Sequence, residues 1–346
     1  MKRHPYFTSR SAGVLLHVSS LPGAHGIGDF GPGAHRFLDW LHATGWNTWQ
    51  VLPICPLGKG DSPYSSPSSF AIEPLLILIE GLVKDGLLPP SAARSTPELR
   101  QGGTKYRSAR RFKEPRLLQA FENFRNTRRG KSRKYIDFLA KSDHWLQPWC
   151  RWASRHRGGD PEFHAFVQFK LEQQWVTLRR AAQARRIRIF GDLPIFVPLE
   201  SADVDADPEL FQLDASGRPT MVTGVPPDQF SRQGQLWGHP QYRWPVHQRT
   251  NFEWWIRRLT AQFDRFDIVR IDHFVGLQKA WNIQAGARSA KVGTWRKTPG
   301  RELLEAFEQR CRGKALVAED LGAVTPAVRR LRDDFGLPGM SLLQNA

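Results

Sequence analysis

The sequence predicts an α/β protein whose parallel strands alternate with helices and close in the manner of an eight-stranded (β/α) TIM-type barrel. Six apolar segments of strand length alternate with amphipathic segments of helical period, a pattern typical of a parallel sheet with helical crossovers. Three successive predicted strands end in a carboxylate, which is where barrel enzymes place their polar groups. The 346 residues, 40% of them hydrophobic, are enough for a large buried core.

The predicted elements follow one another regularly along the chain. The expected strands span residues 13–18, 49–53, 187–196, 268–272, 315–319 and 340–343. The expected helices between them centre on residues 35–43, 162–186, 255–263, 303–307 and 326–335. The last helix has the clearest boundaries, because Thr325 is a typical N-cap, Pro326 suits the first helical position and Gly336 suits the C-cap.

Two closures of such a sheet compete, a doubly wound sheet and a barrel. A dinucleotide-binding sheet requires a glycine-rich turn directly between its first strand and the following helix. The glycine motif GIGDFG at residues 26–31 starts eight residues after the first strand, so a glycine loop shaped by backbone conformation is the better interpretation. The carboxylates of Asp192, Asp272 and Glu319 at successive strand ends favour the barrel.

Two long segments interrupt the alternation. Residues from about 80 to 160 carry helical periodicity and are expected to form an inserted helical subdomain. It is basic between Arg100 and Lys134, where thirteen Lys and Arg stand against two Glu. Residues from about 198 to 245 are rich in Pro, Gly, Asp and Gln and are expected to form loops over the strand ends. We therefore expect one catalytic barrel over residues 1–346 with two insertions.

Composition argues against several classes of protein. No apolar run approaches the roughly 18 residues of a membrane span, and a cytoplasmic protein is expected. Cys55, Cys150 and Cys311 are odd in number and far apart, which indicates reduced thiols and neither a disulfide framework nor a metal site. The net charge of +17 could serve binding to nucleic acid or another polyanion. Apolar residues at helical spacing within the basic segment instead favour packed helices with a solvated basic face.

Asp272 and Glu319 are the candidate catalytic pair of carboxyl groups. Neighbouring strands of a sheet lie about 5 Å apart, and retaining glycosyl transfer needs two carboxyl groups about 5 to 5.5 Å apart. Arg270 points to the same side of its strand as Asp272 and could hold that carboxylate ionised, while His273 could bind a sugar hydroxyl. Two other interpretations remain open at this point. Arg270 and Asp272 could form a structural ion pair, and Asp320 could only support the turn to Gly322.

Several motifs together resemble glycoside hydrolase family 77, the amylomaltases or disproportionating enzymes. In order along the chain they read GVLLHVSSLPG (13–23), GIGDFG (26–31), GDSPY (60–64), GDLPIFV (191–197), GVPPD (224–228), WG (237–238), RIDHF (270–274) and AEDLG (318–322). The resemblance runs from about Arg10 to Gln344. It implies a (β/α)₈ barrel and transfer of an α-1,4-glucan segment to the 4-hydroxyl of an acceptor glucan or glucose.

The resemblance also implies residue roles. Asp272 is similar in position to the nucleophile of the family and Glu319 to its general acid/base. The implied substrate-binding residues are Arg270, His273, Asp192, Tyr64, Ser65, Trp237 and Asp228. No metal or organic cofactor is implied, and no membrane partner. The expected partners are α-1,4-glucans and glucose, and the sequence gives no oligomeric state.

The chain also departs from the family pattern. Members of the family continue through a seventh strand that ends in a third catalytic carboxylate, whereas this chain stops at Ala346, so the last strands of the barrel are expected to be missing from it. Other positions where the family usually has different residues are Ile72, Glu73, Gln229, His239 and Val275. These departures leave a second hypothesis open, an α-glucan-binding paralogue or fragment with impaired catalysis.

Overall fold

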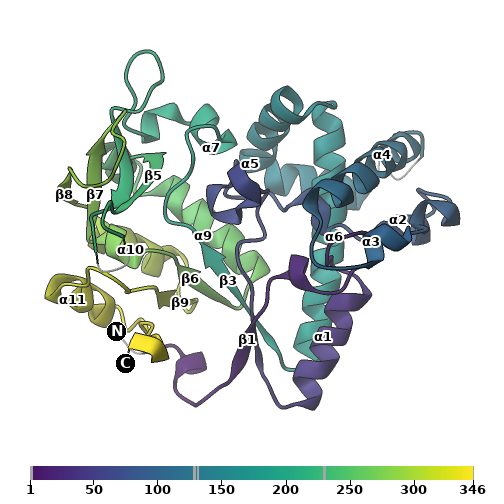
Figure 1. Ribbon diagram of the computed structural model, residues 1–346, viewed down its shortest axis with the longest axis horizontal. Helices are drawn as coiled ribbons and strands as arrows, with labels where there is room; N and C mark the ends of the chain where they lie inside the picture. Colours follow the sequence, from purple (N-terminus) through teal and green to yellow (C-terminus); the bar gives the residue numbers. More distant parts are fainter. Residues whose placement is uncertain (1–2, 128–129, 131, 229–230, 346) are drawn as a thin grey trace. The chain divides into compact units, whose positions relative to one another are not determined.

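The computed structural model describes residues 3–127, 130, 132–228 and 231–345. The chain forms two compact units, and Figure 1 labels many of their helices and strands. The unit made of Ser11–Pro63 and Phe70–Ile189 is called the N-terminal unit here. The unit made of Met1–Arg10, Tyr64–Ser69 and Phe190–Ala346 is called the C-terminal unit. Among the described residues, none of the helices is long and apolar enough to cross a membrane.

The N-terminal unit contains the first parallel strand pair and most of the long helices. Its elements are β1 (Gly13–Leu15), α1 (Pro32–Ala43), β2 (Thr48–Gln50), α2 (Ile79–Lys84), α3 (Pro97–Arg100), α4 (Tyr106–Arg125), α5 (Arg133–Arg157) and α6 (Pro161–Ala184). Strands β1 and β2 are parallel, with Val14 opposite Trp49. The Trp49 ring is fully buried, and its Nε1 donates to the Leu16 carbonyl at 2.7 Å. The crossover helix α1 therefore connects two strands as the alternation predicts.

Helices α3, α4 and α5 lie within the segment expected to be helical, residues 80–160. Helices α4 and α5 pack against α6 through aromatic rings, with Phe124 and Phe166 4.8 Å apart and Tyr135 and Phe169 5.0 Å apart between ring centroids. This packing explains the apolar period inside a basic sequence. That the segment is an insertion into a barrel remains a prediction.

Part of the basic segment is internal. Lys113 is fully buried, and its Nζ lies 3.1 Å from Asp29 Oδ2 and donates to the carbonyls of Leu75 and Ile77. Arg116 lies over the Phe112 ring at 3.5 Å and donates to two carbonyls. These cations hold loops together and are not free for a polyanion. Arg128, Arg129 and Lys131 lie outside the described residues.

The C-terminal unit contains parallel strands of its own. Its elements are β3 (Arg188–Leu193), α7 (Ala202–Ala206), β4 (Met221–Val225), β5 (Gln235–Pro240), α8 (Trp244–Arg249), α9 (Glu253–Arg265), β6 (Ile268–Ile271), β7 (Lys279–Gln284), β8 (Thr294–Lys297), α10 (Gly300–Arg310), β9 (Ala315–Ala318) and α11 (Pro326–Asp334). Strands β3, β6 and β9 are parallel neighbours in that order. Strand β3 starts in the N-terminal unit and ends in the C-terminal unit. The predicted α/β class with a parallel sheet is confirmed.

A glycine next to the site is required by packing. A Cβ atom on Gly191 would lie 2.2 Å from the Phe266 ring, far closer than carbon atoms approach without repulsion. Phe266 is buried at the end of α9, where the chain turns into β6. The absence of a side chain at Gly191 therefore lets β3 lie against this turn.

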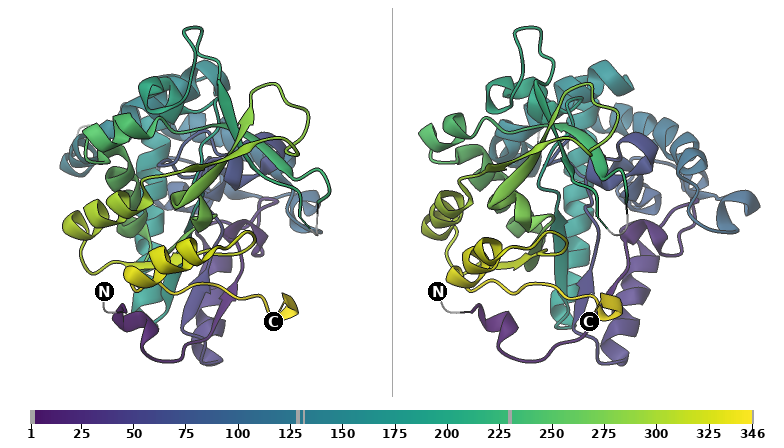
Figure 2. Two further views of the ribbon diagram at one scale, coloured as in Figure 1. Left: turned by 90° about the vertical axis from the view of Figure 1, so that its left-hand side faces the viewer. Right: turned by 60° about the vertical axis from the view of Figure 1, so that its left-hand side comes forward.

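The segment 198–245 is more regular than the loops expected from its composition. It contains helix α7 and strands β4 and β5, and β4 pairs antiparallel with both β5 and β7 in a four-stranded sheet ordered β5-β4-β7-β8. Figure 2 gives two further views of this sheet, whose strands run from teal to light green. Its partner strands β7 and β8 follow β6 in the sequence, and sequence reasoning did not find them. Only long-range pairing stabilises such short strands.

The expected sixth strand at residues 340–343 is wrong. The structure assigns no strand to these described residues, and a 3₁₀ turn spans Leu343–Asn345. The backbone N–H of Met340 donates to Asp320 Oδ1 at 2.8 Å. Beside it, the Pro338 carbonyl accepts from the Ala318 N–H at the end of β9. The Asp320 carboxylate thus accepts a hydrogen bond from a backbone N–H that, in a strand, would donate to the neighbouring strand.

Candidate active site

The register of three strands brings the predicted site residues to one edge. Asp192 on β3 pairs directly with Arg270 on β6, and Ile271 pairs with Ala318 on β9. Asp272 and Glu319 each come one residue after that last pair. The Asp272 N–H donates to the Leu193 carbonyl, and the Glu319 N–H donates to the Ile271 carbonyl. The backbone therefore fixes both carboxyl groups at the ends of neighbouring strands.

Arg270 joins three carboxyl groups. Its Nη1 lies 2.7 Å from Asp192 Oδ1 and 2.7 Å from Asp272 Oδ1, and its Nη2 lies 3.9 Å from Glu319 Oε2. Tyr64 donates its hydroxyl to the other oxygen of Asp192 at 2.7 Å. The ion pair between Arg270 and Asp272 exists, but it is one part of a larger network at the strand ends.

Burial raises the pKa values of the three carboxyl groups. Glu319 reaches a pKa of about 7, because burial outweighs the neighbouring Arg270, and the charge of Asp272 adds to the rise. Asp192 reaches a pKa of about 6, also through burial and against Arg270. Burial also raises the pKa of Asp272, while contact with Arg270 lowers it. Near neutral pH, Glu319 is therefore a carboxyl group that readily holds a proton.

Arg270 remains charged throughout. Burial alone would lower the pKa of its guanidinium, but Asp192 and Asp272 together raise that pKa above its ordinary value. Burial and the charge of Asp192 raise the pKa of Tyr64, so its hydroxyl stays a hydrogen-bond donor. The network therefore has one fixed cation, one fixed phenolic donor and three acids.

His273 turns the chain sharply after β6. Its φ of +52° lies in the left-handed region, which non-glycine residues rarely adopt. In this conformation its N–H donates to Glu319 Oε2 at 2.7 Å. Burial lowers the pKa of the imidazole to about 4, so the ring is neutral near pH 7. Its Nε2 is buried without a hydrogen-bond partner, and the ring meets Trp237 edge to face at 4.8 Å.

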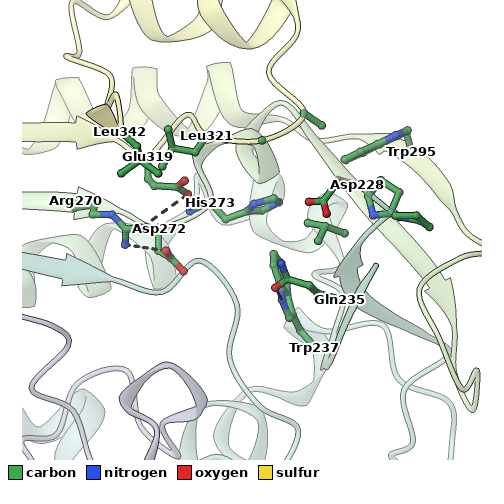
Figure 3. A pocket seen from close by; sticks show the side chains of 15 residues that line it. Asp228, Gln235, Trp237, Arg270, Asp272, His273, Trp295, Glu319, Leu321 and Leu342 are labelled. Carbon is green, nitrogen blue, oxygen red and sulfur yellow. Dashed lines mark hydrogen bonds and ion pairs between the residues drawn. The ribbon is translucent and has the colours of Figure 1, made fainter. Parts of the chain in front are cut away.

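Arg270, Asp272, His273 and Glu319 face a cavity of about 820 Å³ (Figure 3). Asp192 and Tyr64 are not among the described residues that line it. The described residues that line it are Val225, Pro226, Pro227, Asp228, Gln235, Trp237, Arg270, Asp272, His273, Trp295, Glu319, Leu321, Gly322, Ala323 and Leu342. Figure 3 shows Asp272 and Glu319 beside Arg270 on one wall, and Trp237 with Gln235 on another. Such a mixture of apolar and aromatic walls with a few convergent polar groups is typical of a site for a sizeable organic ligand.

Other predicted residues lie differently. Asp228 lines the cavity, and its Oδ1 accepts from the Ser231 N–H. Ser65 is half-buried in a 3₁₀ turn directly after Tyr64 and does not line the cavity. Asp320 accepts from Arg332 and from the Met340 N–H. These contacts fit the role of Asp320 in supporting the turn.

Of the positions that depart from the family pattern, Ile72 and Glu73 have hydrogen-bond partners. Ile72 exchanges two backbone hydrogen bonds with the Gln168 side chain, and both carboxylate oxygens of Glu73 accept from backbone N–H groups. Val275 is buried in the turn after His273. Burial lowers the pKa of His239 on β5 to about 4. Gln229 lies outside the described residues.

Sequence reasoning missed part of the cavity wall. Trp295 on β8 and Gln235 on β5 line the cavity, but both belong to the antiparallel sheet that the sequence did not reveal. No local motif marks them. Among the described residues, no group of three or more His, Cys, Asp or Glu is placed to hold a metal ion. Cys55, Cys150 and Cys311 form no disulfide.

Comparison with known proteins gives a consistent result. The family model for 4-alpha-glucanotransferase, glycoside hydrolase family 77, matches residues 16–160 and 153–346. The 4-alpha-glucanotransferase of Thermus thermophilus is 41% identical, and that of Synechocystis sp. is 40% identical. Each alignment covers 97% of this chain and 73% of the relative.

Two solved structures of amylomaltases have the same fold as this chain. Amylomaltase from Streptococcus agalactiae, determined in complex with acarbose, superimposes with a TM-score of 0.90 at 32% identity over 96% of this chain and 73% of that chain. Amylomaltase from Corynebacterium glutamicum shares the fold with a TM-score of 0.83 at 19% identity, over 97% of this chain and 52% of that chain. The fold is thus that of the barrel family predicted from the strand ends. The chain belongs to glycoside hydrolase family 77, the family of the 4-α-glucanotransferases.

Proposed function

We propose that this protein is a 4-α-glucanotransferase, which moves an α-1,4-glucan segment from a donor to the 4-hydroxyl of an acceptor glucan or glucose. The proposed reaction is a retaining double displacement with Asp272 as nucleophile and Glu319 as general acid/base. One observation carries the proposal. A carboxyl group with a pKa of about 7 and an arginine-paired carboxylate stand at the ends of neighbouring strands and face one cavity. Their unequal environments suit them to the two roles.

In the first half-reaction, Asp272 attacks the anomeric carbon of the donor. Arg270 lies 2.7 Å from Oδ1 of Asp272 and keeps the nucleophile ionised. As the bond from the anomeric carbon to the glycosidic oxygen breaks, Glu319 gives its proton to that oxygen, and the shorter glucan leaves with a new hydroxyl. A glycosyl ester on Asp272 remains, and Glu319 is now a carboxylate.

In the second half-reaction, the 4-hydroxyl of the acceptor attacks the same carbon. Glu319 takes the hydroxyl proton, the new glycosidic bond forms and the ester bond to Asp272 breaks. Both carboxyl groups return to their starting states, and the two inversions retain the α configuration. Since the pKa of Glu319 lies close to neutral, it can give and take a proton within one cycle.

The surrounding side chains would bind the sugar. The side chains of His273 and Trp237 line the cavity, and a neutral imidazole and an indole face suit a sugar hydroxyl and a sugar ring. Asp228 offers a carboxylate farther along the wall. Asp192 and Tyr64 act next to Arg270, and Ser65 directly follows Tyr64 in the sequence. We propose all of these as substrate-binding residues.

The test is disproportionation of maltotriose. The parent protein should yield glucose and longer maltooligosaccharides, and Asp272→Asn should reduce transfer at least about a thousandfold because the ester cannot form. Asp214→Asn is the matched control, since Asp214 lies in an exposed turn that it stabilises by accepting from Ser216 and Arg218. Full transfer in Asp272→Asn would remove Asp272 from the mechanism. Calorimetric binding of maltotriose by the parent with no change in chain lengths would instead support the glucan-binding alternative.

The partners and place of this reaction follow from the same proposal. We propose α-1,4-glucans as donors and either glucans or glucose as acceptors. Some relatives are named as chloroplastic or amyloplastic enzymes, so the cytoplasmic location expected from the sequence stays a prediction for this chain.

A further inference from the structure

The turn that follows β3 is held through consecutive carbonyl groups. Leu193 accepts from the Asp272 N–H at 2.9 Å. Pro194 accepts from Nη2 of Arg258, and Ile195 accepts both from Nη1 of Arg258 at 3.1 Å and from the Tyr242 hydroxyl at 2.7 Å. Asp192 immediately precedes these carbonyls, so the turn decides where its carboxylate lies.

Arg258 is unusual for a helix residue. It sits in the middle of α9 and is 1% exposed. Its guanidinium carbon lies 5.2 and 5.3 Å from the ring centroids of Trp254 and Trp255. Nη1 also lies 3.4 Å from the Tyr242 hydroxyl oxygen. Buried arginine is costly unless its donors are used, and here both terminal nitrogens are directed at the turn.

We infer that Arg258 is a positioning residue of the active site, which clamps the Pro194 and Ile195 carbonyls and thereby holds Asp192 against Arg270. Only the planar fork of a guanidinium can donate to two neighbouring carbonyls in a fixed orientation while its faces lie against rings. Arg258 does not line the cavity, and its hydrogen bonds go to the turn and to Tyr242, so it acts on the site through the turn.

The consequence for the site follows from the contacts of Asp192. Asp192 shares Nη1 of Arg270 with Asp272, each at 2.7 Å, and its other oxygen accepts from Tyr64. If the turn relaxes, Asp192 loses the opposing charge of Arg270, and Arg270 loses one of the anchors that orient it toward Asp272. Displacements of about 1 Å at such positions cost up to about a hundredfold in rate.

The inference rests on the proposed glucanotransferase reaction for its kinetic part alone. The variants are Arg258→Lys, which keeps the charge without the fork, and Tyr242→Phe, which removes one hydrogen bond to Ile195. Arg257→Lys is the matched control. It makes the same substitution one residue earlier, where Arg257 forms an exposed ion pair with Glu253. Each protein is labelled with ¹³C at its Asp carboxyl groups, and the Asp192 signal is assigned with Asp192→Asn.

Titration by NMR gives the readout that a purely structural role would not move. In Arg258→Lys the pKa of Asp192 should rise from about 6 by about one pH unit. The reason is that the relaxed turn moves Asp192 away from the positive charge of Arg270. Tyr242→Phe should move the Asp192 signal in the same direction by less, and Arg257→Lys should leave it in place. The kcat for maltotriose should fall about 10- to 100-fold in Arg258→Lys with a smaller change in KM.

Two results would overturn the inference. The first is a folded Arg258→Lys protein with the Asp192 titration and kcat of the parent. The second result applies if Arg258→Lys does not fold. It is a folded Tyr242→Phe protein in which Asp192 titrates with the pKa that it has in the parent. A parent protein without transfer activity would defeat the proposed function instead, and the titration would still decide the role of Arg258.

Discussion

The free energy of unfolding of a Glu319→Gln variant should increase relative to that of the parent protein as the pH rises. The pKa of Glu319 is about 7 in the fold, against an ordinary value of 4.5, and burial is the main cause. Below about pH 4.5 the carboxyl group is protonated in both the folded and the unfolded chain. Between these values the folded chain binds more protons than the unfolded chain, so the free energy of unfolding falls with rising pH.

The magnitude follows from the difference between the two pKa values. About 2.5 pK units at about 1.4 kcal/mol each give about 3 kcal/mol of stability, present below pH 4.5 and lost as the pH rises through 7. The amide introduced by Glu319→Gln would stay neutral at every pH, and its oxygen could still accept from the His273 N–H as Glu319 Oε2 does. The variant should therefore gain about 3 kcal/mol on the parent between pH 4 and pH 8.

The assay is urea unfolding followed by tryptophan fluorescence at pH steps from 4 to 8. Glu305→Gln on α10 is the control, since Glu305 is exposed and its carboxyl group is solvated in both states. A difference between Glu319→Gln and the parent that is constant from pH 4 to 8 would refute the reasoning. It would mean that the Glu319 carboxyl group titrates alike in the folded and unfolded chains.

Three further predictions concern activity and packing. The kcat/KM for maltotriose should fall about tenfold per pH unit above about pH 7, because Glu319 must be protonated to start the reaction; a profile flat to pH 9 would contradict its role as the acid. Gly191→Ala should cost about 1 to 3 kcal/mol in urea unfolding, because its Cβ would press on the Phe266 ring, whereas Gly103→Ala, with open space around its Cβ position, should change stability by less than about 0.5 kcal/mol. Lys113→Met should cost about 3 to 5 kcal/mol because it leaves Asp29 as an uncompensated buried charge. Equal losses in Lys113→Met and in Lys113→Met with Asp29→Asn would show that the charge of Asp29 is not the cause.

The sequence predicted the part of the fold that repeats locally. The expected helices correspond to α1, α6, α9, α10 and α11, because each carries its apolar period and its boundary residues within one segment. The parallel strands were expected to be longer than they are. The run expected at 187–196 forms β3 only to Leu193, since Pro194 has no N–H and the next carbonyls are taken by Arg258.

What the sequence could not give depends on contacts between distant residues. Strands β4, β5, β7 and β8 are short, and each is stabilised by partners that the local pattern does not name. For the same reason Trp295 was missed as part of the cavity wall. The grouping of Asp192, Arg270 and Asp272 was foreseeable from strand ends. The support from Arg258 was not, because a single arginine within a helix looks like any exposed one.

The charge balance around Arg270 has a consequence for inhibitors. Among the described residues that line the cavity, Arg270 is the one with a permanent positive charge, and it lies near three acids. When Glu319 loses its proton, the site is left with an excess of negative charge. A sugar mimic that carries a cationic nitrogen at the anomeric position would offset part of this negative charge. Its affinity should therefore increase over the same pH range in which turnover declines, so that inhibition is strongest where the enzyme is slowest.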